Sequence, residues 1–308
     1  MLRNRAETIK AGSVPRGPGS CTGVGMHHPL TENDLFPNGP LNRLGQQVLV
    51  LDQIDSTNAV LLARAPALPD GTVAVTDYQT AGRGRQGRRW TAPRGSSILL
   101  SVLLIESGNS PLSLGERAGE SGPAVPHAAM LTALAACEAI DACTDCQPAL
   151  RWPNDLALGG KKLGGVLAES TPVGTAMPAH PRARALVIGV GINCLQQPGH
   201  FQGELADKAT SLEIESDQPI HRAALAHELL RQIDGRLAAC VREHRGWEQV
   251  RTAWKSRCDD LGARVTLQDG GQSFTGTVLD ITADGDLLVQ LDRGGRRHFG
   301  SATTTRLW

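Results

Sequence analysis

The stretch AGRGRQGRRW, residues 81–90, concentrates four arginines and three glycines in front of a tryptophan. It lies between two apolar stretches, GTVAVTDYQ (71–79) and SSILLSVLLI (96–105), which the sequence predicts as strands. Glycine allows positive φ and a close approach of backbone N–H groups to a ligand. Arginine offers forked donors that suit phosphate or carboxylate. We therefore predict a mobile loop between two strands that orders around an anionic, phosphate-bearing ligand.

Other interpretations of this loop fit less well. It is not a P-loop, because no Gly-Lys-Ser/Thr follows, and it lacks the helix and the later acidic residue of a dinucleotide fingerprint. Arg/Gly contacts with RNA usually lie in disordered tails rather than between strands. A purely solvated loop would leave four arginines repelling one another without a partner.

The net charge of the chain gives no indication of a nucleic-acid or anionic-membrane partner. The 308 residues carry 31 Lys plus Arg and 31 Asp plus Glu, with 40% apolar residues. No apolar run approaches the roughly 20 residues of a membrane span, and no apolar segment follows the basic residues at the N-terminus. Seven cysteines, an odd number, favour a reducing compartment, so we predict a cytoplasmic protein.

The cysteines give no metal centre. Cys143 and Cys146 form the single CxxC of the chain, whereas a zinc ribbon needs a second pair. We predict ordinary thiols at the end of an Ala-rich helix, and no metal site built from protein ligands.

Strand and helix signals alternate through the body of the chain, which predicts a mixed α/β or α+β fold. Strands are expected at 46–54, 71–79, 96–105 and 184–193, two more at 149–170 around a Gly-Gly turn, and helices at 59–65 (with DSTN as its N-cap), 127–143 and two within 219–257.

The ends of the chain differ from this body. Residues 1–40 are rich in Gly and Pro and predict a flexible tail, and 106–126 predict a surface insertion. Residues 260–308 show short alternating strands with Asp-Gly and Gly-Gly turns, which predict a small β-barrel. The body between them, 41–259, is expected to form the main domain.

Three further polar clusters follow the arginine loop: RWPNDL (151–156), GGKKLGG (159–165) and GVGIN (189–193). Each alone is better explained by a turn, a hairpin tip or a strand end than by a functional role. With DSTN (55–58) and the loop itself, in this order and spacing, the chain resembles the biotin protein ligase family. The resemblance covers about residue 44 to the C-terminus. It implies a class II synthetase-like catalytic domain, α+β with a mixed sheet and flanking helices, followed by an SH3-like barrel.

The resemblance also implies the chemistry. Biotin would be activated by ATP to biotinyl-5'-AMP with release of pyrophosphate. It would then pass to a lysine of the biotin carboxyl carrier protein of acetyl-CoA carboxylase. Mg²⁺ is expected on the phosphates. A loop closed over the adenylate would exclude water until the carrier lysine arrives.

The resemblance assigns the site residues as well. Catalytic roles fall to Arg85, Lys162 and Asp155. Biotin would contact Ser56, Thr57, Asn58, Gln79, Arg83, Gly84, Arg85, Lys162, Gly164 and Gly165. ATP and the adenylate would contact Arg85, Arg88, Trp90, Asn154, Lys162, Asn193 and, by a looser alignment, Arg306.

Some family members carry an N-terminal helix-turn-helix that binds DNA. The first 40 residues are too few and too aperiodic for one, so we expect a ligase alone, without specific DNA binding, as a monomer or homodimer. Two rivals stay open. A lipoate–protein ligase would share the fold and the adenylate chemistry, and a nucleic-acid-binding regulator would use the arginine loop as its contact.

Overall fold

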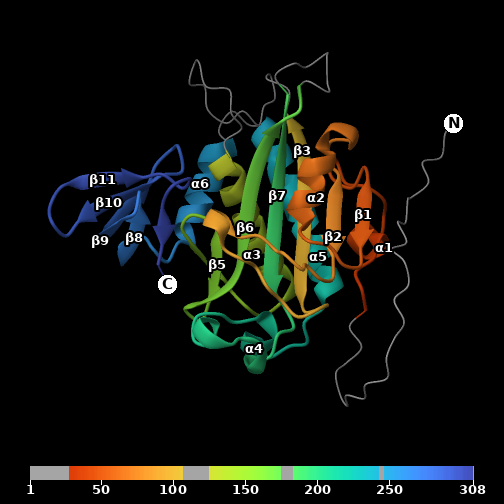
Figure 1. Ribbon diagram of the computed structural model, residues 1–308, viewed down its shortest axis with the longest axis horizontal. Coiled ribbons are helices and arrows are strands. Elements are labelled where there is room, and N and C mark those ends of the chain that lie inside the picture. The colour runs from red at the N-terminus through yellow and green to blue at the C-terminus, as the bar shows by residue number, and fades with distance from the viewer. Residues whose placement is uncertain (1–27, 107–124, 175–182, 243–245, 308) are drawn as a thin grey trace.

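The structure, a computed structural model, describes residues 28–106, 125–174, 183–242 and 246–307. A central sheet is built from β1 (Val48–Leu51), β2 (Val73–Thr76), β3 (Ser97–Glu106), β4 (Ala149–Arg151), β5 (Asp155–Leu158), β6 (Lys161–Pro172) and β7 (Arg184–Asn193). Its order is β1-β2-β3-β7-β6-β5-β4, and β1 and β2 are its parallel pair (Figure 1). All other neighbouring strands run antiparallel.

A second, antiparallel sheet follows at the C-terminal end. Its order is β11-β10-β9-β8-β12, and it lies beside the β4 edge of the central sheet (Figure 1). The strands are β8 (Arg264–Asp269), β9 (Gln272–Ile281), β10 (Leu287–Leu291), β11 (Arg296–Phe299) and β12 (Thr305–Arg306). A mixed sheet with helices and a separate C-terminal antiparallel sheet confirms the predicted α+β class.

Helices cover both faces of the central sheet. They are α1 (Glu32–Leu35), α2 (Thr57–Arg64), α3 (Val125–Cys143), α4 (Leu212–Glu215), α5 (Arg222–Arg242) and α6 (Gly246–Ser256). Helices α3 and α5 lie on one face and share its core, while α2 packs on the other face. None of the helices in the described part of the chain is long and apolar enough to cross a membrane.

Side-chain alternation in β3 divides the core between the two faces. Ile98, Leu100, Val102 and Leu104 point to α3 and α5, whereas Leu103 packs toward α2. Successive side chains of a strand face opposite sides, so a strand covered on both faces appears in sequence as a continuous apolar run. The same reasoning explains the apolar run of β7.

The C-terminal sheet is fixed to the body by polar contacts, several of them buried. Trp152 Nε1 donates to the Gly285 carbonyl at 2.9 Å, and Trp247 Nε1 donates to the Ala283 carbonyl at 2.6 Å. The carboxylate of Asp260, which has no exposed surface, accepts the Trp152 N–H at 2.8 Å and the Arg306 Nε–H at 2.6 Å. The C-terminal sheet is therefore oriented relative to the RWPNDL segment.

Residues 28–40 correct the prediction of a flexible tail that ends at residue 40. Thr31 forms a capping box with Asp34, and the cap starts α1. Leu30, Leu35 and Phe36 are buried in the core that α5 shares. Three apolar residues are too few to show periodicity, but the capping box was readable in sequence as T-x-x-D. Residues 1–27 of that prediction lie outside the described residues.

Two further predictions are refined. The stretch 149–170 holds three strands rather than two, because the chain also turns at residues 152–154, between β4 and β5. Of the insertion predicted at 106–126, residues 107–124 lie outside the described residues. Glu106 instead ends β3, and Val125 starts α3. Cys143 and Cys146 are free thiols, as predicted, and Cys143 is the last residue of α3.

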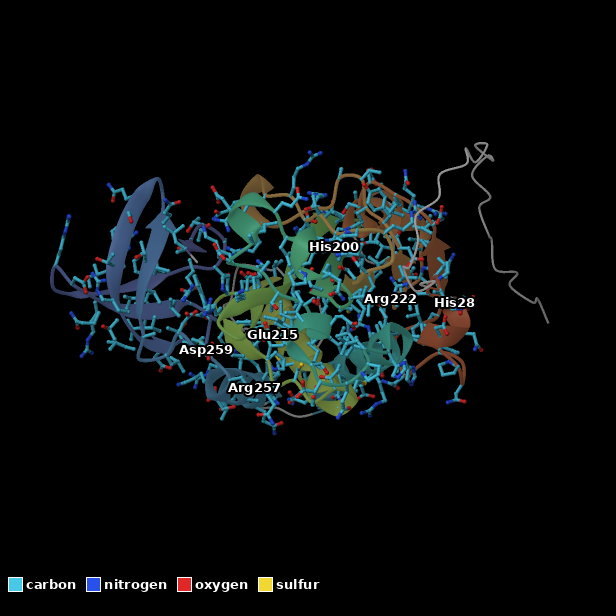
Figure 2. The ribbon with its side chains drawn as sticks, turned by 90° about the horizontal axis from the view of Figure 1, so that it is seen from below. His28, His200, Glu215, Arg222, Arg257 and Asp259 are labelled. Carbon is cyan, nitrogen blue, oxygen red and sulfur yellow. The ribbon has the colours of Figure 1, made fainter. Side chains whose placement is uncertain are left out.

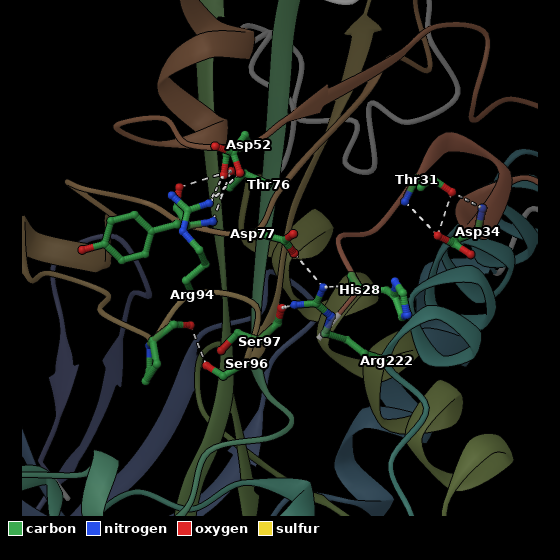
Figure 3. Close-up of polar contacts among 12 residues, drawn as sticks. His28, Thr31, Asp34, Asp52, Thr76, Asp77, Arg94, Ser96, Ser97 and Arg222 are labelled. Carbon is green, nitrogen blue, oxygen red and sulfur yellow. Dashed lines mark hydrogen bonds and ion pairs between the residues drawn. The ribbon is translucent and has the colours of Figure 1, made fainter. Parts of the chain in front are cut away.

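Arg222, at the start of α5, joins three segments of the fold (Figure 3). Its guanidinium contacts Asp77 Oδ1 at 2.6 Å and donates to the carbonyl oxygens of His28 at 3.0 Å and Ser97 at 3.4 Å. Both charged side chains are over nine-tenths buried. The ion pair therefore connects the N-terminal segment and α5 to the ends of β2 and β3.

We predict that Arg222→Met lowers the free energy of unfolding by about 3–5 kcal/mol, because Asp77 is left buried without its partner charge. The matched control is Arg231→Met on the same helix, whose exposed pair with Glu228 contributes about 1 kcal/mol or less. Urea unfolding measures both variants. Equal losses in the two would contradict a structural role for the buried pair.

Candidate active site

The candidate site lies on the face of the central sheet opposite α3 and α5, where small residues leave space above the strands. Beyond the part that α2 covers, the residues of β3 and β7 that point to this face are small or polar apart from Leu99; they include Ser101, Gly189, Gly191 and Asn193. A Cβ on Gly189 would lie 2.2 Å from Asn58 Oδ1, and one on Gly191 would lie 2.8 Å from the Trp90 ring. These glycines are required because other side chains occupy the space above them.

The arginine loop folds back on itself as a small hairpin over this area. Trp90 N donates to Gly82 O at 3.0 Å, and Gly84 N donates to Arg88 O at 2.7 Å. Its tip is a 3₁₀ turn, η2 (Arg85–Gly87), in which Gln86 takes the left-handed region at φ +53°. Few non-glycine residues adopt this conformation without support from their surroundings.

The C-terminal sheet supplies that support. Gln86 Nε2 donates to the Thr303 carbonyl at 3.0 Å, and Gln86 Oε1 accepts from the Thr305 hydroxyl. Arg85 donates to the carbonyl oxygens of Ser301 and Thr304. The tip of the arginine loop is therefore held by the segment that joins β11 to β12.

Arg85 is an under-neutralised cation, by which we mean that the oxygens that accept its hydrogen bonds carry no full negative charge. Its protein partners are neutral oxygens: the two carbonyls and, at 3.4 Å, Asn154 Oδ1. Burial lowers the pKa of Arg85, the negative charge of Asp155 offsets part of this, and the neighbouring Arg88 lowers it further. A guanidinium stays protonated in proteins, so an arriving anion would relieve this charge.

Two other cations are already paired with carboxylates. Lys162 Nζ lies 2.6 Å from Asp155 Oδ1 across the β5–β6 hairpin, and Arg83 lies 2.6 Å from Glu169. A Cβ on Gly165 would lie 3.1 Å from the Asp155 carboxylate, so this glycine makes room for the pair. The backbone of Lys162 also exchanges hydrogen bonds with Lys208 O and Thr210 N.

These features enclose one cavity of about 510 Å³, which we call the central cavity. Its walls include nearly all the predicted site residues: Ser56, Thr57, Asn58, Gln79, Arg83, Gly84, Arg85, Arg88, Trp90, Asn154, Asp155, Lys162, Gly165, Asn193 and Arg306. Among the described residues, no cluster of three or more His, Cys, Asp or Glu side chains could hold a metal ion by itself.

Gly164 is the exception among the predicted residues. It pairs with Ile192, whose side chain lies in the core beneath the sheet, while Gly165 pairs with Gly191 on the cavity side. A Cβ on Gly164 would lie 2.7 Å from Gly191 O. Adjacent residues of a strand face opposite sides, so Gly164 serves close strand packing and does not line the cavity.

Sequence reasoning missed one wall of the cavity. It is formed by the segment between β7 and α4, with the short turns η4 (Pro198–His200) and η5 (Gly203–Leu205); Figure 2 labels His200 from this segment. The lining residues are Gln196, His200, Phe201, Glu204, Leu205, Lys208 and Ala209. The segment has neither a motif nor a periodicity that could have indicated this role.

Two buried polar atoms of the cavity walls have no hydrogen-bond partner among the described residues. They are Trp90 Nε1, a donor, and Gln196 Oε1, an acceptor. Buried polar groups are normally satisfied, so such atoms indicate where a ligand would complete the bonding.

Comparisons with known proteins agree with this geometry. Residues 50–193 match the Biotin/lipoate A/B protein ligase family, and residues 260–303 match the Biotin protein ligase C terminal domain. The bifunctional ligase/repressor BirA of Bacillus spizizenii is 31% identical over 274 residues, covering 88% of this chain and 78% of BirA. The chain belongs to the biotin protein ligase family.

Other relatives support the assignment. The biotin–[acetyl-CoA-carboxylase] ligase of Mycobacterium tuberculosis is 34% identical over 254 residues, covering 82% of this chain and 85% of that protein. A biotin protein ligase from Aquifex aeolicus, solved in complex with biotin and ATP, superposes with a TM-score of 0.67. It is 24% identical and covers 85% of this chain and 99% of its own. The predicted family fold is thereby confirmed.

We predict that Gln86→Ala loosens the contact between the arginine loop and the C-terminal sheet. The variant loses both side-chain bonds to the sheet, worth roughly 1–3 kcal/mol, but keeps the unfavourable backbone conformation. Trypsin should then cleave after the arginines of 83–89 several-fold faster than in the unaltered protein. Cleavage at Arg293, in an exposed turn of the C-terminal sheet, serves as the internal reference. An unchanged ratio of the two rates would contradict the contact.

Proposed function

We propose that the central cavity is where ATP activates biotin and from which biotin passes to a carrier lysine. Membership of the family establishes the ATP-dependent ligation of biotin, and the assignment of steps to residues is our proposal. One observation carries it. The under-neutralised Arg85, the Asp155–Lys162 pair and the Ser-Thr-Asn start of α2 converge on one cavity.

In the first step, a carboxylate oxygen of biotin attacks the α-phosphorus of ATP, and the bond to pyrophosphate breaks. Two anions must approach each other, so cations placed where they meet lower the barrier. We assign this role to Arg85 and Lys162, with Arg88 on the phosphates. Asp155 positions the Lys162 ammonium through their 2.6 Å contact.

The same cavity offers groups for both ends of the adenylate. We assign the biotin head to Ser56, Thr57, Asn58 and Gln79, which lie at the start of α2 and after β2. We assign the adenine end to Trp90, Asn154 and Asn193. The unpaired Trp90 Nε1 supports this placement, because a nucleotide acceptor would satisfy it. Arg306 lies in the wall, held by Asp260, where a phosphate could reach it.

In the second step, the ε-amine of the carrier lysine attacks the acyl carbon of the adenylate and AMP leaves. The carrier we propose is the biotin carboxyl carrier protein of acetyl-CoA carboxylase, the target named for the M. tuberculosis relative. A base must take the amine proton, and Asp155 is the wall carboxylate beside Lys162 that we assign to it.

We include Mg²⁺ in the proposal, bound to the ATP phosphates. Magnesium is typically held by one or two carboxylates, waters and substrate phosphates rather than by a protein cage. The walls fit that description, because Asp155 and Glu204 contribute carboxylates without forming a cluster of three. When bound, the ion would neutralise phosphate charge in the first step.

The remaining expectations stay part of the proposal. We divide the chain into a catalytic body to residue 259 and an SH3-like domain from 260, which accords with the second sheet starting at Arg264. We propose a cytoplasmic ligase, monomeric or homodimeric, without specific DNA binding. A steep salt dependence of binding to duplex DNA would contradict the last point.

The first test is ATP–pyrophosphate exchange on the purified protein, with biotin and with lipoate in parallel. We expect exchange with biotin alone, because the first step is reversible and forms pyrophosphate. Exchange with lipoate alone would assign the cavity to the sister activity. Absence of exchange with both biotin and lipoate would contradict the proposed function.

We further predict that Arg85→Gly still forms the adenylate, because Lys162 and Arg88 remain to offset the charge of the two anions, but releases it. The variant loses the bonds from Arg85 to the C-terminal segment and with them part of the closed loop. Nearby lysines of unrelated proteins should then become biotinylated, which streptavidin blotting detects. Arg94→Gly, which breaks an exposed pair with Asp52 beyond the loop, is the matched control. Labelling confined to the carrier in both variants would refute this role of Arg85.

A further inference from the structure

Glu169, on β6, connects the arginine loop to the start of α2. Its Oε1 contacts Arg83 Nη2 at 2.6 Å, and its Oε2 accepts from Asn58 Nδ2 at 2.9 Å. Glu169 does not line the central cavity, and neither does Ser101, which contacts Asn58 from β3. Both act on the cavity through residues that do.

The contacts of Asn58 fix which way its amide points. Asn58 Nδ2 faces Glu169 Oε2 and also the Leu167 carbonyl at 3.1 Å, and both of these atoms accept hydrogen bonds without donating any. The NH₂ group must therefore lie on that side, and Oδ1 must face the other way. Asn58 is 3% exposed and lies over Gly189, whose missing side chain makes room for it.

The orientation of Asn58 fixes the protons of two hydroxyl groups. Asn58 Oδ1 can only accept, so Ser101, which is fully buried, donates its single hydroxyl proton to it at 2.6 Å. The 2.7 Å contact between the hydroxyls of Ser101 and Thr57 must then have Thr57 as donor. The proton of Thr57 is thereby used, and its oxygen is left to accept.

The amide of Gln79 is fixed by the backbone. Thr57 N–H donates to Gln79 Oε1 at 2.9 Å, so the NH₂ group of Gln79 forms the other end of that amide. The longer 3.3 Å contact between Thr57 Oγ1 and Gln79 Oε1 carries no proton in this arrangement. Thr57 and Gln79 both line the central cavity.

We propose that this chain, from Glu169 through Asn58 and Ser101 to Thr57, sets the hydrogen-bond polarity of the cavity where biotin is recognised. Thr57 offers an acceptor and Gln79 a donor, which complement the N–H and C=O of a ureido group. Glu169 is a positioning residue, and Ser101 transmits its effect. A site built for one donor–acceptor pattern discriminates against a ligand with another. The inference rests on the function proposed above.

The test breaks the chain at two independent points, with Glu169→Gln and Ser101→Ala. Glu169→Gln lets the Asn58 amide turn, and Ser101→Ala frees the Thr57 proton without touching the Arg83–Glu169 pair. In pyrophosphate exchange, each should raise the KM for biotin roughly tenfold or more, because a buried bonding group is left mismatched. The KM for ATP and kcat should stay within about twofold, as for a loss of binding alone.

A second ligand distinguishes a change in the hydrogen-bond polarity of the cavity from a general loss of its structure. In 2-iminobiotin an imino group replaces the ureido oxygen, so its guanidinium offers donors only. The preference for biotin, taken as the Ki of 2-iminobiotin over the KM for biotin, should fall in both variants. Glu213→Gln, on the exposed side of α4, and Ser170→Ala, beside Glu169 on β6, are matched controls and should leave the preference unchanged.

Equal weakening of both ligands would assign Glu169 and Ser101 a merely structural role and overturn the inference. Unchanged constants in both variants would overturn it as well, while leaving the proposed function intact if the unaltered protein exchanges with biotin. An unaltered protein without biotin-dependent exchange would overturn the proposed function and this inference together.

Discussion

The pairing of β3 with β7 along ten residues is the constraint on which the rest of the molecule depends. On one face the two strands present bulky side chains to α3 and α5. On the other face, α2 covers part of the two strands, and serine, glycine and asparagine, with Leu99 among them, leave the remaining part open to the cavity. The same residues thus build the core and clear the site. A larger side chain at Gly189 or Gly191 would meet Asn58 or Trp90 rather than empty space.

The C-terminal sheet completes the site instead of merely following it in the chain. Its core residues, such as Val265 and Phe299, belong to the same buried cluster as α3 and α5. Asp260 orients it against Trp152, and its last segment holds Arg85 and Gln86. The loop that carries the charge is therefore stabilised in part by residues more than two hundred positions away in the sequence.

Much of this could be predicted from sequence, because each motif combines strand or helix signals with residues whose chemistry is specific. The loop at 82–90, the Ser-Thr-Asn start of α2 and the two sheets were predictable for that reason. Gly164 was assigned to the site because the motif was treated as one unit, whereas strand alternation places Gly164 and Gly165 on opposite faces of the sheet and only Gly165 lines the cavity. The wall at 196–209 could not be predicted, since tertiary contacts alone bring this aperiodic segment to Lys162.

The cations of the cavity fall into two kinds, and the difference bears on their roles. Arg83 and Lys162 already have carboxylate partners, so an arriving anion would compete with those carboxylates for each cation. The proposed contribution of these two cations is therefore mainly to position the substrate. Arg85 is held by neutral oxygens and buried, which lowers its pKa, so its charge gains most when negative charge develops nearby. In the proposed mechanism, the paired groups therefore orient the substrate, and Arg85 acts with Lys162 to stabilise the reacting phosphate. The backbone of Arg85 lies at the tip that the C-terminal sheet holds, so the position of its guanidinium at the cavity depends on that sheet.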